Sequence, residues 1–430
     1  MKQGYVRQFT SFALSLVLLV SLTQTSFGYS VLTHEAIIDS TWNDSIKPLL
    51  LKRFPTATAE QLREAHAYTY GGAIIQDMGY YPFGSKLFTD LTHYVRSGDF
   101  IELLIKESKD LNEYAFALGA LAHHAADNEG HSIATNQAVP ILYPKLRAKH
   151  GNEVTYDESP SAHLKTEFGF DVLQVAKGRY APENYHDFIG FKVSKSVLER
   201  AFLKTYGLEM KDLFTDLDLA IGTYRYTASM LIPQMTKVAW ETKEDEIEKL
   251  VPGITREKFL YNFSRPSYDE EWGQKYDKPG FLSKTMAFFL QVVPKVGPFE
   301  ALAFKTATPE TEQMFQASFT ATLSHYRTLL RQVPSKRINL PNNNFDTGRP
   351  TRAGEYDPAD DAYAKLLKKL ASRNFRQVTP ELRQNLLAFY GDLNAPIATK
   401  TDKSDWQKTL RAITELKATV GQLPNQRVRN

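Results

Sequence analysis

Apolar residues recur every three or four positions along most of this chain, which is the spacing of amphipathic helices. No stretch shows the sustained alternation of a half-buried strand. The pattern predicts an all-α fold of many helices, with the helical stretches at residues 34–42, 58–75, 110–132, 136–149, 160–178, 194–206, 212–240, 309–332, 359–372 and 379–393.

Capping residues support several of these helix starts. Thr33 precedes the first helix, Thr58 with Gln61 forms a capping box, and Asp110 opens the predicted helix at residues 110–132. Thr308 followed by a proline is a further start signal.

The first 28 residues follow a different pattern. Lys2 and Arg7 precede an apolar run at residues 12–22, and Ser26 and Gly28 occupy the small-residue positions of a signal-peptidase site. We expect a signal peptide at residues 1–28 and export to the periplasm or the medium. A membrane anchor is the alternative, but the run is about half of the ~20 residues that a span needs.

Composition narrows the classes of function. Of the 430 residues, 42% are hydrophobic and 23% are charged, which is ordinary for a globular protein. Lys+Arg number 52 and Asp+Glu 49, so loss of Lys2 and Arg7 with the signal leaves 50 against 49, and nothing favours a surface that follows nucleic-acid phosphates. Cysteine is absent, which excludes disulfides and thiolate metal sites.

The C-terminal half gives weaker signals. Residues 280–304 are strongly apolar, and we interpret them as core or helix packing, with insertion into a lipid interface as the alternative. Residues 333–358 form a loop rich in Pro, Asn and Gly. We expect a catalytic domain at residues 29–240 and a helical region of unknown role at 241–430.

One helix carries an unusual set of ionisable residues. His123, Asp127 and His131 recur at intervals of four, so a continuous α-helix would place them on one face, about 6 Å apart along the axis. His163 and Glu167 repeat this spacing on the next long helix. Without cysteine, a metal would be held by such imidazole and carboxylate groups. His34-Glu35 is not an HExxH zinc-protease motif, because position 38 is isoleucine.

The ordered set of these residues resembles the zinc-dependent phospholipase C family, an all-α fold shared with single-strand-specific zinc nucleases. The resemblance covers about residues 29–178. Nine positions match the family pattern in order and type: Tyr29, His34, Asp77, His93, His123, Asp127, His131, His163 and Glu167.

The resemblance implies three zinc ions. The first would be bound by Asp77, His93, His123 and Asp127, and the second by His131, His163 and Glu167. Asp127 would bridge to a third, completed by His34 and by the amino group and carbonyl of Tyr29, the first residue after signal cleavage.

Two positions depart from the family pattern. Tyr29 stands where the family usually has tryptophan, but the terminal amine and carbonyl would be the ligands. The short interval between Asp127 and His131 resembles the branch that includes glycosylphosphatidylinositol-specific phospholipase D. This departure bears on the identity of the substrate rather than on metal binding.

Clustered divalent ions suit in-line displacement at phosphorus, because they neutralise phosphate charge and activate water. We therefore expect an exported phosphodiesterase that cleaves phospholipids at a membrane surface. The resemblance implies that Asp77 lies at the metal edge nearest the attacking water and accepts its proton, with purely structural ligation as the alternative role. A nuclease on the same scaffold and a non-catalytic lipid- or metal-binding protein are the alternatives.

Other candidate residues fit no ligand position. His124 points about 100° away from His123 on a helix, so we expect a structural role for it. Tyr80 and Tyr81 could border the cleft or simply pack. The remaining histidines outside the pattern are His66, His150, His186 and His325.

Overall fold

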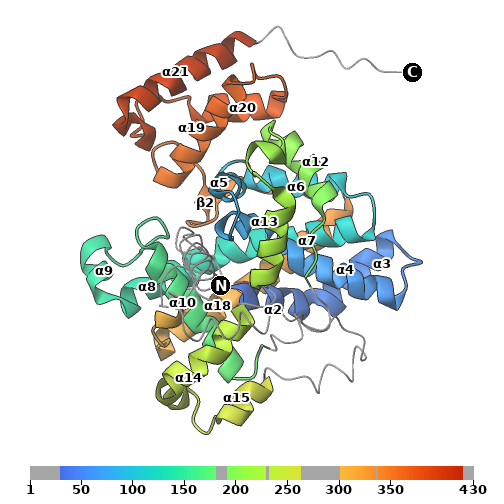
Figure 1. Ribbon diagram of the computed structural model, residues 1–430, viewed down its shortest axis with the longest axis vertical. Coiled ribbons are helices and arrows are strands. Elements are labelled where there is room, and N and C mark those ends of the chain that lie inside the picture. The colour runs from blue at the N-terminus through green and yellow to red at the C-terminus, as the bar shows by residue number, and fades with distance from the viewer. Residues whose placement is uncertain (1–29, 181–190, 229–231, 263–300, 336–337, 420–430) are drawn as a thin grey trace, which may run out of the picture.

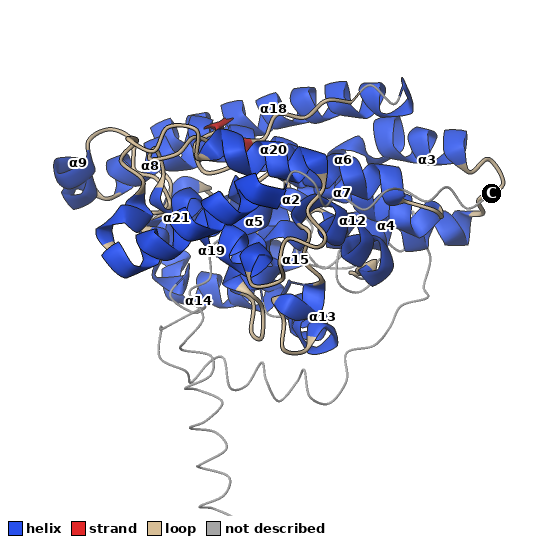
Figure 2. Cartoon of the chain, turned by 90° about the horizontal axis from the view of Figure 1, so that it is seen from above, coloured by secondary structure: helices blue, strands red, loops and turns tan. Residues whose placement is uncertain are grey.

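The computed structural model describes residues 30–180, 191–228, 232–262, 301–335 and 338–419, and these are mainly helical (Figures 1 and 2). The expected all-α class is confirmed for this part of the chain. Its α-helices are α2 (Val31–Thr41), α3 (Lys47–Arg53), α4 (Ala59–Gly72), α5 (Lys86–Tyr94), α6 (Ser97–Glu107), α7 (Leu111–Glu129), α8 (Asn136–Leu142), α9 (Pro144–His150), α10 (Pro160–Ala176), α12 (Lys195–Tyr206), α13 (Leu217–Tyr226), α14 (Ile232–Leu250), α15 (Arg256–Asn262), α18 (Pro309–Gln332), α19 (Asp357–Ala371), α20 (Pro380–Phe389) and α21 (Lys403–Ala418).

Short irregular elements join these helices. Two are π-helical turns, η1 (Trp42–Ile46) and η3 (Gly130–Thr135). The 3₁₀ turns are η2 (Ile75–Tyr80), η5 (Met210–Asp212), η8 (Val333–Ser335) and η9 (Ala398–Thr401). The strands β1 (Asn343–Asn344) and β2 (Arg349–Pro350) pair antiparallel as a short hairpin.

Helix α7 is the central element. Its first turn is capped as predicted, since the Asp110 side chain accepts the Glu113 N–H at 2.8 Å, and almost every later residue is buried. Helix α18 lies along it, with the Tyr326 hydroxyl donating to the Leu118 carbonyl at 2.8 Å. The polar ligand residues of α7 are therefore enclosed by other helices.

Two glycines let α4 pack against α7 at very short range. A Cβ added at Gly72 would lie 2.0 Å from the Phe116 carbonyl oxygen, and one at Gly119 would lie 2.0 Å from the Thr69 carbonyl oxygen. Only a residue without a side chain allows this approach. It brings the end of α4 next to the middle of α7, where His123 lies.

The capping box at Thr58 forms as predicted, and Thr308 caps α18 at its predicted start, where it forms a capping box with Thr311. Thr33 does not cap α2. Its hydroxyl donates to Asp171 Oδ1 at 2.7 Å, and the N-cap residue is Ser30.

Two predicted helices are interrupted. The stretch 136–149 breaks at Tyr143, whose extended backbone before Pro144 follows the steric restriction on residues that precede proline. The stretch 212–240 is divided because Asp216 caps a new helix, α13, by accepting the Leu219 N–H at 3.0 Å.

The prediction of a continuous α-helix through His131 was wrong. Helix α7 ends at Glu129 and continues as the π-helical turn η3. The Ser132 hydroxyl donates to the Asn128 carbonyl at 2.7 Å, so a side chain competes for a carbonyl that an α-helical N–H would use. His131 is therefore displaced from the α-helical face of His123 and Asp127.

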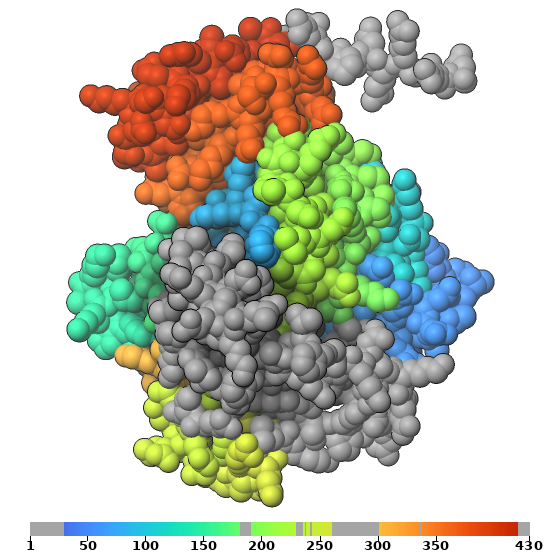
Figure 3. All heavy atoms as spheres, viewed as in Figure 1, coloured from blue at the N-terminus to red at the C-terminus, as the bar shows by residue number. Residues whose placement is uncertain are grey.

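The C-terminal helices α19, α20 and α21 gather at one end of the molecule, and Figure 3 shows them against segments from the first half of the chain. No helix in the described ranges combines the length and hydropathy of a membrane span. The expected signal peptide, Tyr29 and most of the apolar stretch 280–304 lie outside the described residues. The domain division at residue 240 stays a prediction.

Candidate metal centre

Eight of the nine predicted ligands lie in the described residues, and all eight are buried. They come from six elements: His34 from α2, Asp77 from η2, His93 from α5, His123 and Asp127 from α7, His131 from η3, and His163 and Glu167 from α10. Their ligand atoms form three overlapping or adjacent groups, each within 4.8 Å: His34, His123 and Asp127; Asp77, His93 and His123; His131, His163 and Glu167.

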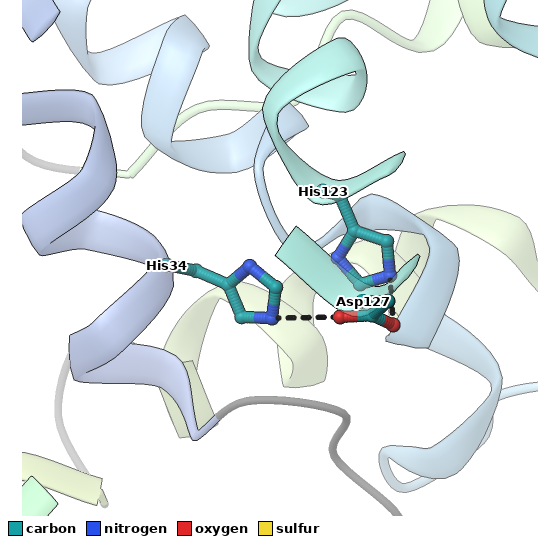
Figure 4. A group of neighbouring side chains, drawn as sticks. All are labelled: His34, His123 and Asp127. Carbon is teal, nitrogen blue, oxygen red and sulfur yellow. Dashed lines mark ion pairs between the residues drawn. The ribbon is translucent and has the colours of Figure 1, made fainter. Parts of the chain in front are cut away.

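The first two groups share His123, and we call their five residues the first cluster. Asp127 is at its centre: Oδ2 lies 3.0 Å from His123 Nε2 and 3.5 Å from His93 Nε2, while Oδ1 lies 3.5 Å from His34 Nε2. Asp77 Oδ1 is 3.2 Å from His93 Nε2. Figure 4 shows His34 directed at one oxygen of the Asp127 carboxylate and His123 at the other, and the two imidazole rings stack with centroids 4.7 Å apart. One carboxylate thus faces three imidazoles.

Backbone carbonyls orient the rings of His93 and His123. His93 Nδ1 lies 2.9 Å from the Thr89 carbonyl oxygen, and His123 Nδ1 lies 2.9 Å from the Ala73 carbonyl oxygen. A carbonyl can only accept, so each Nδ1 carries the proton and each Nε2 faces the cluster. The two Nε2 atoms are 3.5 Å apart. In the neutral rings these are two opposed lone pairs, an arrangement that needs a cation or a proton between them.

The charges of the first cluster shift its pKa values strongly. Burial alone would lower the pKa of His93, but the Asp127 and Asp77 carboxylates outweigh it and raise the pKa to about 10. Burial would raise the pKa of Asp127, yet His123, His93 and His34 hold it well below its ordinary value. Without metal, the cluster therefore contains an imidazolium between two carboxylates.

His131, His163 and Glu167 form the second cluster. His163 Nε2 donates to the Val154 carbonyl oxygen at 2.6 Å, which leaves Nδ1 as an acceptor, and that atom lies 3.6 Å from Glu167 Oε1. The rings of His131 and His163 stack at 5.8 Å. Within the described part of the chain, neither Glu167 oxygen has a hydrogen-bond partner. A buried carboxylate beside an imidazole lone pair suits a cation.

Burial dominates the pKa values of the second cluster. It lowers the pKa of His163 to about 3, with the neighbouring His131 acting in the same direction. Burial and then Asp127 raise the pKa of Glu167 well above its ordinary value. Without metal, burial therefore favours the neutral imidazole of His163 and the protonated carboxyl group of Glu167.

The donor set fits zinc. Imidazole nitrogen and carboxylate oxygen are zinc ligands, and both clusters present them buried, with His93, His123 and His163 oriented by backbone carbonyls. Metal ligation by these eight residues, and by Tyr29, stays a prediction, because the geometry alone brings the residues together without identifying an ion.

A family model described as zinc dependent phospholipase C matches residues 33–216, a range that contains all eight clustered residues. This part of the chain belongs to the zinc-dependent phospholipase C family. Searches of curated proteins and of solved structures found no match. The match over this segment supports the enzyme class, a zinc-dependent hydrolase that cleaves phospholipids.

The histidines that fit no ligand position of the phospholipase C pattern have other contacts. His124 Nε2 lies 3.4 Å from the Pro341 carbonyl oxygen, in line with a structural role. His66 stacks on Trp42, His150 lies beside Glu158 in the turn before α10, and His325 lies beside Glu129 of α7. His186 lies outside the described residues.

The sequence reasoning missed one wall of the phospholipase C centre. Phe345, in the β1–β2 hairpin, packs against His93 and His123, with ring centroids 5.3 and 6.0 Å away. The next residue, Asp346, places Oδ1 3.7 Å from His131 Nε2. Asn and Asp in a polar loop are ordinary turn residues, so nothing in the local sequence indicates that Phe345 or Asp346 belongs to the site. Tyr80, by contrast, is one of the two tyrosines predicted from the sequence to lie either at the cleft or in packing, and its ring lies 6.3 Å from that of His93.

Proposed function

We propose that this protein is an exported phospholipase C that binds three zinc ions in the two clusters and hydrolyses the phosphodiester bond of membrane phospholipids on the glycerol side. The observation that carries the proposal is the position of Asp127, whose two oxygens face His34 on one side and His93 and His123 on the other. A carboxylate in that position is suited to bridge two ions. The second cluster would hold the remaining one.

When bound, zinc would neutralise charge on the phosphodiester and lower the pKa of the attacking water. The protein's own part is to supply the base. Burial raises the pKa of Asp77, although His123 and His93 oppose it, whereas the pKa of Asp127 is held low. Two carboxylates with opposite shifts divide the roles: Asp127 stays ionised as a ligand, and Asp77 accepts the water proton.

Substrate hydrolysis by the His123→Ala variant tests the proposal most directly. His123 belongs to two of the three ligand groups, so its loss should remove zinc and lower the rate by at least about 10³-fold, the equivalent of about 4 kcal/mol of transition-state stabilisation. His150→Ala, on α9, is the matched control and should retain activity. Full hydrolysis by a zinc-free His123→Ala preparation would refute the proposal.

The products decide the type of reaction. Phosphatidylcholine liposomes should yield diacylglycerol. Phosphatidic acid would instead indicate cleavage on the headgroup side, and hydrolysis of single-stranded DNA in a parallel assay would indicate a nuclease. The absence of every product from zinc-loaded protein would support a non-catalytic binding role.

Export is proposed together with a role for the new N-terminus. Helix α2 begins at Val31 and carries His34 into the first cluster, so cleavage after Gly28 would create the Tyr29 amine only five residues before His34 in the sequence. N-terminal sequencing of protein secreted by an expressing cell should find Tyr29 first, with about three zinc ions per chain. A form that keeps Met1 should bind less zinc, and equal zinc content in both forms would contradict the role of the amine.

A further inference from the structure

The β1–β2 hairpin, residues 343–350, brings the C-terminal region to the metal centre. Its backbone is tied to the catalytic helices, since the Phe345 N–H donates to the His93 carbonyl at 3.2 Å and the Asn136 side-chain amide donates to the Asp346 carbonyl at 2.7 Å. Gly348 fits closely, because a Cβ there would lie 2.8 Å from the Asn128 carbonyl oxygen. The hairpin is therefore held in a fixed position beside η3 and α5.

Asp346 is the charged residue of this hairpin that turns inward. Its side chain is 3% exposed. Oδ2 accepts two hydroxyl hydrogen bonds, from Tyr94 at 2.7 Å and from Tyr356 at 2.5 Å. These bonds fix the carboxylate plane and leave Oδ1 directed at His131, 3.7 Å from Nε2.

No lysine or arginine contacts the Asp346 carboxylate among the described residues. Its charge also acts on the other members of the second cluster, contributing to the pKa of both His163 and Glu167. A buried carboxylate without a lysine or arginine partner is costly, and the buried carboxyl group of Glu167 belongs to the same cluster, so that ionising it would add to that cost. A divalent cation between them would remove this cost.

We propose that Asp346 is a fourth protein ligand of the metal ion at the second cluster, beside His131, His163 and Glu167. Ligand atoms of one tetrahedral zinc ion lie roughly 3.3–3.6 Å apart when each bond is ~2.0–2.2 Å, which is close to the separation of His131 Nε2 and Asp346 Oδ1. The inference rests on the proposed metal centre. It goes beyond the matched domain, because Asp346 lies 130 residues after that domain ends at residue 216.

The assignment changes the role of the C-terminal region. Residues 33–216 would contain only three protein ligands of the second ion, and the C-terminal hairpin would complete the set. Tyr94 and Tyr356 are positioning residues in this arrangement, since each holds the carboxylate oxygen that faces away from His131.

The test compares Asp346→Asn with Asp357→Asn in the full-length processed protein. Asp357 lies eleven residues further on, at the exposed start of α19, so its substitution makes the same chemical change away from the centre. Metal content is measured by mass spectrometry after dialysis against a competing chelator, and the Co²⁺-substituted proteins are compared by their visible absorption, which reports the ligands of the ion.

Asp346→Asn should lose about one equivalent of metal, or bind it at least about 10- to 100-fold more weakly, and the Co²⁺ absorption should change. Asp357→Asn should match the unmodified protein. Unchanged content, affinity and Co²⁺ absorption in Asp346→Asn would overturn the inference. Weaker binding with an unchanged Co²⁺ absorption would also overturn it, because Asp346 would then only orient His131.

If Asp346→Asn does not fold, Tyr356→Phe takes its place. This variant keeps the carboxylate and removes one of the two hydroxyls that fix it, so a smaller change in Co²⁺ absorption is expected, and no change would overturn the inference. The measurement needs no substrate. Protein that holds the second ion through Asp346 but cleaves no phospholipid would refute the proposed function and leave this inference standing.

Discussion

The two clusters use similar residues but hold their charges in opposite ways. In the first, the pKa of His93 is raised to about 10 and that of Asp127 is held low, so the metal-free cluster is a buried ion pair. In the second, the pKa of His163 is lowered to about 3 and that of Glu167 is raised, so burial favours the neutral forms of these two groups. The two clusters therefore differ in how their buried groups are stabilised without a cation. In the first cluster a charged imidazole and carboxylate pair with each other, and in the second His163 and Glu167 favour their uncharged forms.

We expect the largest difference in stability between the two clusters when one ligand in each is replaced by glutamine. In metal-free protein, His93→Gln leaves Asp77 and Asp127 without their cation, and losing one partner of a buried ion pair should cost about 3–5 kcal/mol in the free energy of unfolding. Glu167→Gln resembles the protonated carboxyl group that the second cluster already contains, so it should cost less than about 1 kcal/mol. Urea denaturation in the presence of a chelator measures both.

The pH dependence follows from the sign of the His93 shift. Its pKa in the folded protein lies above the ordinary value of 6.5, so the protonated ring stabilises the fold fully below pH 6.5, and this contribution is lost as the pH rises toward about 10. The cost of His93→Gln should shrink over that interval. If His93→Gln and Glu167→Gln lower the free energy of unfolding equally at pH 6, the two clusters do not differ in how they hold their charges.

A smaller effect is expected where α4 packs on α7. Gly119→Ala should destabilise the protein by about 2 kcal/mol, because the overlap with the Thr69 carbonyl outweighs the gain of up to ~1 kcal/mol from alanine's helix propensity. The shift would also move Ala73, whose carbonyl orients His123, so zinc affinity should fall at the first cluster and not at the second.

Gly222→Ala on α13 is the control for that substitution. A Cβ at Gly222 meets nothing within 4 Å, so alanine there should be neutral or slightly stabilising in thermal unfolding. If Gly119→Ala is as stable as Gly222→Ala, the close approach of α4 and α7 does not constrain the first cluster.

The sequence predicted what depends on local spacing. Helix α18 begins and ends where the apolar pattern and the Thr308 cap placed it, and His123 with Asp127 lie together because residues four apart share a face of an α-helix. The family resemblance brought in Asp77 and His93, whose meeting across a loop no periodicity could predict. Zinc dependence and the phospholipase C class agree with the family match.

What the sequence could not predict depends on contacts across the chain. Asp346 reaches His131 from a loop whose sequence indicates only turns. Tyr94 and Tyr356, which donate hydrogen bonds to its carboxylate, are 252 and 10 residues away along the chain. The π-helical turn at Gly130 depends on a side-chain hydrogen bond from Ser132 that the helical pattern does not reveal. Tyr29 lies outside the described residues, so its place in the site stays a prediction.

The π-helical turn η3 also bears on how the two clusters communicate. The turn begins at Gly130, three residues after Asp127, and contains His131, and π-helical hydrogen bonds are less favourable than those of the α-helix on either side. Amide protons there should exchange with deuterium sooner than those of α7, and an ion at either cluster should slow that exchange, because the first ion would hold Asp127 just before the turn and the second would hold His131 within it. Deuterium exchange in this one short segment would thus report whether each of the two clusters holds an ion. The second ion should slow the exchange even when the first is absent.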